Sequence, residues 1–118
     1  MLTLLPSVRV FLAIEPVDMR GSFDALAGHV RRLGLDPVSG HLYVFLSRNR
    51  RLAKILWFDG SGWCVLAKRL VRGTFQLPDR LDGVDRLMID ASSLAALLDG
   101  IDLRAPRRRW YRRKSTSP

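Results

Sequence analysis

Apolar positions along the chain follow two different periods, and each period predicts a different kind of element. Residues 8–14 are rich in β-branched and other apolar residues, which predicts a strand that ends at Glu15-Pro16. Apolar residues then recur at helical spacing between Ser22 and Gly34. This spacing predicts a helix with Ser22 as its N-cap and Gly34 just beyond its last residue.

The stretch 41–77 predicts a meander of antiparallel strands. Its apolar segments are separated by turn signals at residues 48–51, at residues 59–62 and around Gly73. If both four-residue turns are tight, Ser47 pairs with Leu52 and Phe58 pairs with Trp63. The predicted strands are 41–47, 52–58, 63–70 and 74–77.

This register sorts the side chains of the meander onto two faces. One face is mainly aliphatic, and we expect it to form the core against the helices. Its residues are Leu42, Val44, Leu46, Ala53, Ile55, Trp57, Cys64, Leu66 and Leu70, with Lys68 near its end. The other face is aromatic with basic residues interleaved, and it contains Tyr43, Phe45, Lys54, Leu56, Phe58, Trp63, Val65, Ala67 and Arg69.

The aromatic face has three interpretations. Exposed aromatic side chains stack on unpaired bases in some proteins, and in others they dock a protein partner. Alternatively, a strand or helix covers this face, and its basic side chains reach solvent at the rim. The candidate partner-binding residues are Tyr43, Phe45, Lys54, Phe58, Trp63 and Arg69.

The chain after the meander predicts one more strand, over 86–89, and one more helix, which Asp90 caps. The predicted fold class is therefore α+β: an antiparallel β-meander of four to five strands with two helices packed on one face. Residues 1–103 are expected to form a single domain. Residues 104–118 are expected to form a flexible, basic C-terminal tail.

The composition is typical of a folded domain in a reducing cytoplasm. A chain of 118 residues with 47% apolar residues is long enough to bury a core without disulfides. Its single cysteine excludes an internal disulfide framework and a multi-cysteine zinc site. No apolar stretch approaches the roughly 20 residues of a membrane span, and the first residues lack the pattern of a secretory signal. We therefore expect a cytoplasmic protein with no membrane partner.

The positive charge is concentrated at the C-terminal end. The whole chain carries a formal net charge of +9, but residues 1–103 carry only +2. Arginine and lysine neutralise phosphates and release condensed counterions, and the aromatic residues within the run can stack on bases or sugars. The bland alternative is a solvated, charged terminus. The candidate DNA-binding residues of the tail are Arg104, Arg107, Arg108, Arg109, Trp110, Tyr111, Arg112, Arg113 and Lys114.

The turn 48–51 is a second candidate for contact with DNA. Its arginines, Arg48, Arg50 and Arg51, stand at the tip of a predicted hairpin, from which they can enter a groove or contact a phosphate backbone. Loop tips are also where ordinary solvated charges collect. Phosphate contacts supply affinity without sequence choice, because every nucleotide carries the same phosphate.

The residues that could carry catalysis are too dispersed to predict an enzyme. His29 and His41 are twelve residues apart without a carboxylate at metal-ligand spacing. Asp18, Asp24 and Asp59 stand where turns and helix caps use carboxylates. No glycine-rich phosphate loop is present in the sequence. We therefore expect no catalytic residues, no cofactor and no metal.

Several stretches, in order along the chain, resemble a known family. Residues 17–26 (VDMRGSFDAL) resemble its D-M-R-K-x-F-D-x-L signature, and residues 36–45 (DPVSGHLYVF) its D-P-x-S-G-x-L-F-V-F run. Residues 54–62 (KILWFDGSG), 68–75 (KRLVRGTF) and 94–101 (LAALLDGI) resemble three further blocks. The chain therefore resembles the TnpB accessory protein of the sixty-six-type bacterial insertion sequences.

The resemblance implies a protein of a mobile element that supports transposition beside a separate transposase. It supplies no catalytic residues. Two departures are visible: Val71-Arg72 stands where an acidic residue is usual, and Gly21 where a lysine is common. Asp18 and Arg20 of the first signature can pair with each other or with the meander; the alternative is that Arg20 faces a phosphate.

Two main hypotheses about function follow; a third, a catalytic component such as a nuclease, is disfavoured by the dispersed carboxylates. The first is a non-enzymatic accessory protein for transposition that binds DNA through the basic arm. The second is a protein adaptor that docks the transposase through the aromatic sheet face, with only non-specific attraction to DNA. An uncovered aromatic face would also favour a homodimer, because apolar patches of that size seldom stay bare.

Overall fold

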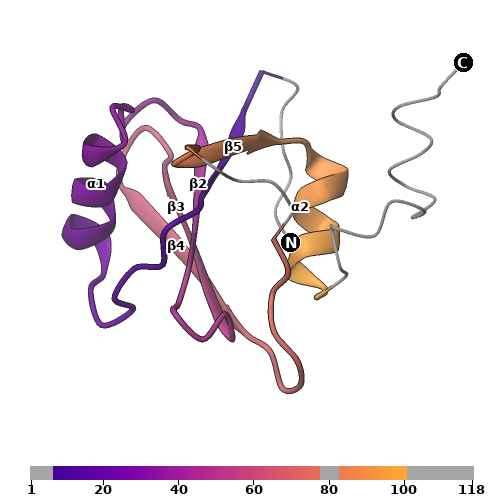
Figure 1. The fold of residues 1–118 in the computed structure, drawn as a ribbon. Helices are drawn as coiled ribbons and strands as arrows, with labels where there is room; N and C mark the ends of the chain where they lie inside the picture. Colours follow the sequence, from indigo (N-terminus) through magenta and orange to yellow (C-terminus); the bar gives the residue numbers. More distant parts are fainter. Residues whose placement is uncertain (1–6, 78–82, 101–118) are drawn as a thin grey trace, which may run out of the picture.

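The computed structural model describes residues 7–77 and 83–100, which form a five-stranded mixed sheet with two helices (Figure 1). The order of the strands across the sheet is β4-β3-β2-β1-β5. The α+β class is thereby confirmed. The strands are β1 (Val10–Ala13), β2 (Leu42–Leu46), β3 (Leu52–Phe58), β4 (Trp63–Arg69) and β5 (Arg86–Ile89), and the helices are α1 (Phe23–Arg32) and α2 (Ala91–Leu98).

The antiparallel meander of β2, β3 and β4 is confirmed together with its register. The Ser47 amide donates to the Leu52 carbonyl at 2.9 Å, and Phe58 pairs with Trp63. In the second turn, the Asp59 carboxylate accepts hydrogen bonds from the backbone amides of Ser61 and Gly62 at 3.0 and 2.9 Å. Both four-residue turns therefore hold the register that the sequence predicts.

The sheet is not purely antiparallel, because β1 pairs in parallel with β2. The connection between these two strands contains α1, so β1, α1 and β2 form a crossover unit of the kind that parallel pairing requires. On its other side β1 pairs antiparallel with β5. Residues 74–77 were predicted to be a strand and are not: Phe75 instead donates its amide to the Arg50 carbonyl at 2.7 Å.

The two helices lie on opposite sides of the sheet, so the prediction that both pack on one face is wrong (Figure 1). The aliphatic face packs against α2 through Leu94 and Leu97, and Phe75 and Leu77 join the same cluster. The aromatic face packs against α1 through Leu26, Ala27 and Val30. The cause is the crossover, which carries α1 over one face, whereas α2 follows the edge strand β5 back over the other.

The two helices begin differently. Asp90 caps α2 as predicted, since its carboxylate accepts from the Ser93 amide at 2.8 Å. Ser22 is the N-cap of α1, as predicted, and its carbonyl accepts from the Leu26 amide at 2.9 Å, but its side chain makes no capping hydrogen bond. Within the two described ranges, no helix has the length and apolar character needed to cross a bilayer. The predicted domain boundary at residue 103 lies outside the described residues.

Candidate nucleic-acid interface

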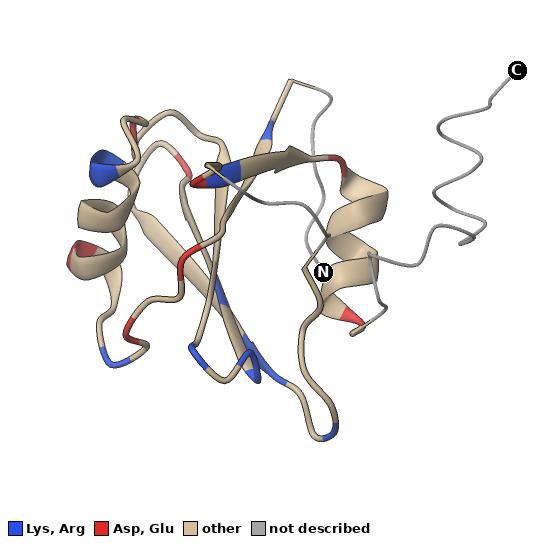
Figure 2. Ribbon diagram, viewed as in Figure 1, with Lys and Arg blue, Asp and Glu red and all other residues tan. Residues whose placement is uncertain are grey.

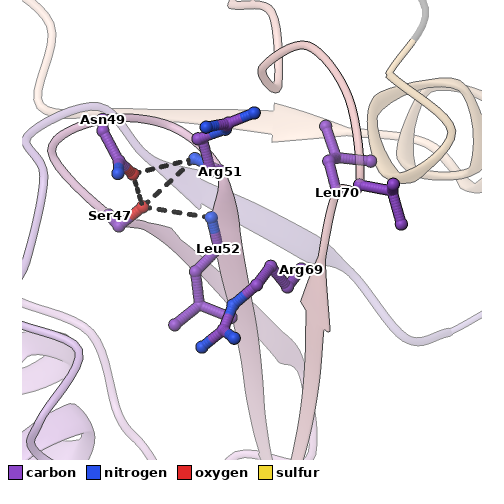
Figure 3. A pocket seen from close by; sticks show the side chains of 7 residues that line it. Ser47, Asn49, Arg51, Leu52, Arg69 and Leu70 are labelled. Carbon is purple, nitrogen blue, oxygen red and sulfur yellow. Dashed lines mark hydrogen bonds between the residues drawn. The ribbon is translucent and has the colours of Figure 1, made fainter.

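The C-terminal candidate residues lie outside the described residues, so the described part of the interface centres on the turn between β2 and β3. Ser47 and Asn49 hold this turn from within (Figure 3). The Ser47 hydroxyl accepts from the Leu52 amide at 3.1 Å and donates to the Asn49 side-chain oxygen at 2.8 Å. That oxygen also accepts from the Arg51 amide at 3.1 Å. The turn is therefore stabilised by hydrogen bonds among its own residues.

Arg50 adopts a left-handed backbone conformation, with φ of 58°. A residue with a side chain pays about 1–2 kcal/mol for this conformation, so glycine or asparagine usually stands at such a position. The Arg50 amide donates to the Ser47 carbonyl at 2.9 Å, and its own carbonyl accepts from Phe75. The hydrogen bonds on both sides of Arg50 therefore hold an arginine where a smaller residue would fit with less strain.

The end of β4 and the loop after it lie directly beside this turn. Arg69 pairs with Leu52 across the sheet, and the Leu70 amide donates to the Arg51 carbonyl at 2.9 Å. The loop that contains Arg72 is thus anchored to the turn through Leu70 at one end and Phe75 at the other. We call the resulting cluster the basic end: Arg48, Arg50, Arg51, Lys68, Arg69 and Arg72. Figure 2 shows these basic segments gathered at one end of the sheet.

Two residues of the basic end, Arg51 and Arg69, line a hollow of about 600 Å³ between the turn and the end of β4. Ser47, Asn49, Leu52 and Leu70 contribute its uncharged walls, and Arg51 and Arg69 its charged ones. Figure 3 shows the guanidinium groups of Arg51 and Arg69 pointing in different directions. The two groups are therefore placed to meet two separate anionic groups.

The arginines of the basic end have no carboxylate partner within 4.0 Å among residues 7–77 and 83–100. Within the described ranges, Lys68 is the one member of the cluster in an ion pair, with Asp99 at 3.7 Å, and the two side chains are 41% and 68% exposed. All five arginines of the basic end are exposed: Arg48, Arg50, Arg51, Arg69 and Arg72. Their charge is therefore available to an anionic ligand.

The residues predicted to bind a partner do not form one open face. Tyr43 and Phe45 are 2% and 1% exposed beneath α1, so the prediction that they present a surface is wrong. The alternative interpretation, in which a helix covers this face, describes both residues. Tyr43 also uses its hydroxyl internally, donating to the Asp36 carbonyl at 2.7 Å. Phe58 and Trp63 are half-buried and pack edge to face, 5.1 Å between ring centroids, at the opposite end of β3 and β4 from the basic end.

Lys54 has a structural role in the described chain. Its ammonium group donates to the carbonyls of Met19 and Gly21 at 2.8 and 3.1 Å, which ties β3 to the segment that leads into α1. We expect Lys54→Met to lower the free energy of unfolding by about 2 kcal/mol, because both carbonyls lose a charged donor. Urea denaturation followed by circular dichroism measures this change. Lys68→Met is the control: its exposed ion pair is worth less than about 1 kcal/mol, and equal losses in the two variants would contradict the role given to Lys54.

Asp18 and Arg20 pair with each other rather than with the meander. The Arg20 guanidinium reaches the Asp18 carboxylate at 2.6 Å, and the Arg20 amide donates to it at 2.9 Å. Hydrogen bonds from the Arg20 side chain and backbone lower the pKa of Asp18 from 3.8 to about 2. Both side chains are exposed, so the pair orders the local segment and adds little stability.

The residues considered for catalysis are engaged in local contacts. The His41 ring accepts from the Arg9 amide at 3.0 Å, and the His29 ring lies 2.8 Å from the Arg32 guanidinium. The Cys64 thiol contacts the Asp59 carboxylate at 3.6 Å, and desolvation together with that carboxylate raises the pKa of the thiol. Across residues 7–77 and 83–100 there is no group of three or more histidine, cysteine or acidic side chains placed to hold a metal ion.

The fold and the interface define a small α+β protein with an arginine-rich end. The family model described as "IS66 Orf2 like protein" matches residues 8–108, and the chain belongs to this family of insertion-sequence accessory proteins. The resemblance seen in the sequence motifs is thereby confirmed. Two proteins of Sinorhizobium fredii are similar over most of their length.

The first of these relatives, "Uncharacterized protein y4hO", is 42% identical over 111 residues, which cover 91% of this chain and 95% of the relative. The second, "Uncharacterized protein y4jC", is 29% identical over 107 residues, 90% of each chain. No solved structure matches the chain. The family membership therefore associates the protein with transposition.

Proposed function

We propose that this protein is a non-enzymatic accessory factor that binds the DNA of its insertion sequence while the separate transposase performs strand transfer. The observation that carries this proposal is the basic end: exposed arginines, free of carboxylate partners among the described residues, gathered on one side of a folded body. The family membership supplies the context of transposition. The charge of residues 104–118 adds the second basic element.

The mode of binding follows from the chemistry of these residues. Arginine presents a planar fork of donors that matches two phosphate oxygens, and most of the charge in both basic elements is arginine. Phosphate contacts fix position and affinity but do not distinguish sequences. In this proposal, recognition of the element ends is therefore supplied by the transposase or by another part of this chain.

The experiment is a salt series of DNA binding by the full chain. We expect the logarithm of the affinity to fall with the logarithm of the salt concentration with a slope of at least about 6, which is a loss of about a thousandfold or more between 50 and 200 mM salt. Fluorescence anisotropy of a labelled duplex measures the affinity, with element-end and scrambled duplexes compared. Absence of binding at low salt would refute the proposal.

The adaptor hypothesis is the second candidate. In the structure, its aromatic docking surface is smaller than the sequence predicts. Tyr43 and Phe45 belong to the core, while Phe58 and Trp63 remain half-buried near the edge strand β4. A transposase or a second copy of the chain could contact that edge. We favour DNA binding because the basic end presents five exposed arginines, whereas the remaining aromatic surface consists of two half-buried side chains, Phe58 and Trp63.

A further inference from the structure

We propose that the basic end is a preformed site for the backbone of duplex DNA, in which Arg69 and Arg72 act together with the arginines of the β2–β3 turn. This inference rests on the proposed function and adds to it a contact made by described residues, in addition to the charge of residues 104–118. It also assigns DNA contact to two residues outside the DNA-binding set predicted from the sequence: Arg69 on β4, which was a candidate for partner binding, and Arg72 in the loop after β4.

The first step is that the basic end is held in place before any ligand arrives. Three backbone contacts join its parts: Arg69 pairs with Leu52, Leu70 bonds to Arg51, and Phe75 bonds to Arg50. A site whose backbone is already ordered loses less conformational entropy on binding than a disordered segment does. The basic end can therefore contribute a fixed orientation as well as affinity.

The second step concerns Arg50. Its left-handed conformation strains the backbone, and strained residues tend to cluster at functional sites. A glycine at this position would satisfy the same turn without the strain. The arginine side chain is exposed and has no carboxylate partner in the described ranges. A contact made by that side chain outside the protein explains why an arginine stands there.

The third step selects duplex DNA over a single strand. Proteins that hold single strands without sequence preference stack the bases on aromatic side chains. No aromatic residue lines the hollow of the basic end, and the half-buried pair Phe58 and Trp63 lies at the far end of the same strands. The guanidinium groups of Arg51 and Arg69 diverge, which suits contact with separate phosphates rather than with one (Figure 3).

The fourth step relates the basic end to the tail. Helix α2 ends at Leu98, after which Asp99 forms the ion pair with Lys68. Gly100 lies against Leu70, since a Cβ built on it would be 3.7 Å from a Leu70 methyl carbon. The described chain therefore ends beside the basic end, and only three residues separate Gly100 from Arg104. Two basic elements joined by so short a connection act on one DNA at high effective concentration.

The test uses the full chain and three variants. Arg69→Gln/Arg72→Gln removes two charges from the basic end, and Arg31→Gln/Arg32→Gln removes two exposed charges from α1 as the matched control. Arg50→Gly removes one charge while relieving the backbone strain, so it is expected to fold at least as well as the parent chain. Affinity for a labelled duplex is measured across a salt series, and thermal unfolding confirms that each variant is folded.

We expect the salt slope to fall by about 2 for Arg69→Gln/Arg72→Gln and by about 1 for Arg50→Gly, with the control unchanged, because each lost phosphate contact reduces the slope by about 0.9. Equal slopes for all three variants and the parent chain, with duplex binding intact, would overturn this inference and leave the proposed function standing. Tighter binding to a single strand than to the duplex would overturn the choice of ligand. Failure of the parent chain to bind any DNA would overturn both proposals.

Discussion

Replacing Phe45 by alanine is expected to lower the free energy of unfolding by about 3–5 kcal/mol. Phe45 is 1% exposed and packs in the cluster between the sheet and α1. Removing its ring leaves a cavity that the surrounding strands and helix cannot fill completely. A domain of this size has a total stability of about 5–15 kcal/mol. The substitution therefore removes a large part of that stability. Urea or thermal denaturation measures the change in the free energy of unfolding.

Phe23 provides the matched control for this substitution. It is the same residue type at the first position of α1, but it is 44% exposed. We expect Phe23→Ala to change the free energy of unfolding by less than about 1 kcal/mol, since little apolar area is lost from the interior. A Phe45→Ala variant that kept the stability of the parent chain would show that the aromatic face is open, and it would revive this residue as a docking site.

The register of the meander could be predicted from the sequence because it depends on local signals. Turn residues at 48–51 and 59–62 fix which positions face each other, and alternation then sorts the side chains. The sorting of Val44 and Ile55 to one face and Tyr43 and Leu56 to the other matches the two clusters of the core.

The positions of β1 and α1 could not be predicted in the same way. The pattern of residues 8–14 indicates a strand, but nothing local distinguishes a parallel from an antiparallel neighbour. The all-apolar run of β2, buried at every position, carried the missing signal, because a strand covered on both faces reads as a continuous hydrophobic segment. Because β2 is buried on both faces, a helix must cover the aromatic face, and α1, which lies in the crossover between β1 and β2, is that helix.

The basic end was only partly predictable. The arginines of the turn stand out as a run in the sequence, but Arg69 was assigned to the aromatic face and Arg72 only noted as a departure from the family. Extending the predicted pairing by a few residues would have set Arg69 opposite Leu52, beside the turn. The hydrogen bond from the Phe75 amide to the Arg50 carbonyl is a non-local contact, and no periodic pattern in the sequence predicts it.

The basic end and residues 104–118 are expected to contribute to DNA binding in different ways, and the difference can be measured. The basic end carries six basic residues on a folded backbone, and residues 104–118 carry seven within fifteen positions. Each charge that meets a phosphate adds to the salt dependence, whereas an element of fixed geometry also determines how the protein lies on the duplex. Loss of the basic end and loss of residues 104–118 are therefore expected to change the affinity and the salt slope differently.

Deletion of residues 104–118 is expected to reduce the salt slope of duplex binding by about 6, because seven basic residues each contribute about 0.9. At low salt the truncated chain should still bind weakly through the basic end, and Arg69→Gln/Arg72→Gln in the truncated chain should weaken that remaining binding and lower its slope by about 2. Anisotropy of a labelled duplex across a salt series measures both effects.

A tail in which every arginine is replaced by lysine is the control, since it keeps the charge and loses the bidentate fork. We expect this control to keep the slope of the parent chain, because the slope counts neutralised phosphates and not the geometry of the contacts. A fall in affinity at constant slope would assign bidentate phosphate contacts to the tail. A truncated chain with the affinity and slope of the parent would refute a role for the tail, and it would leave the basic end as the whole of the interface.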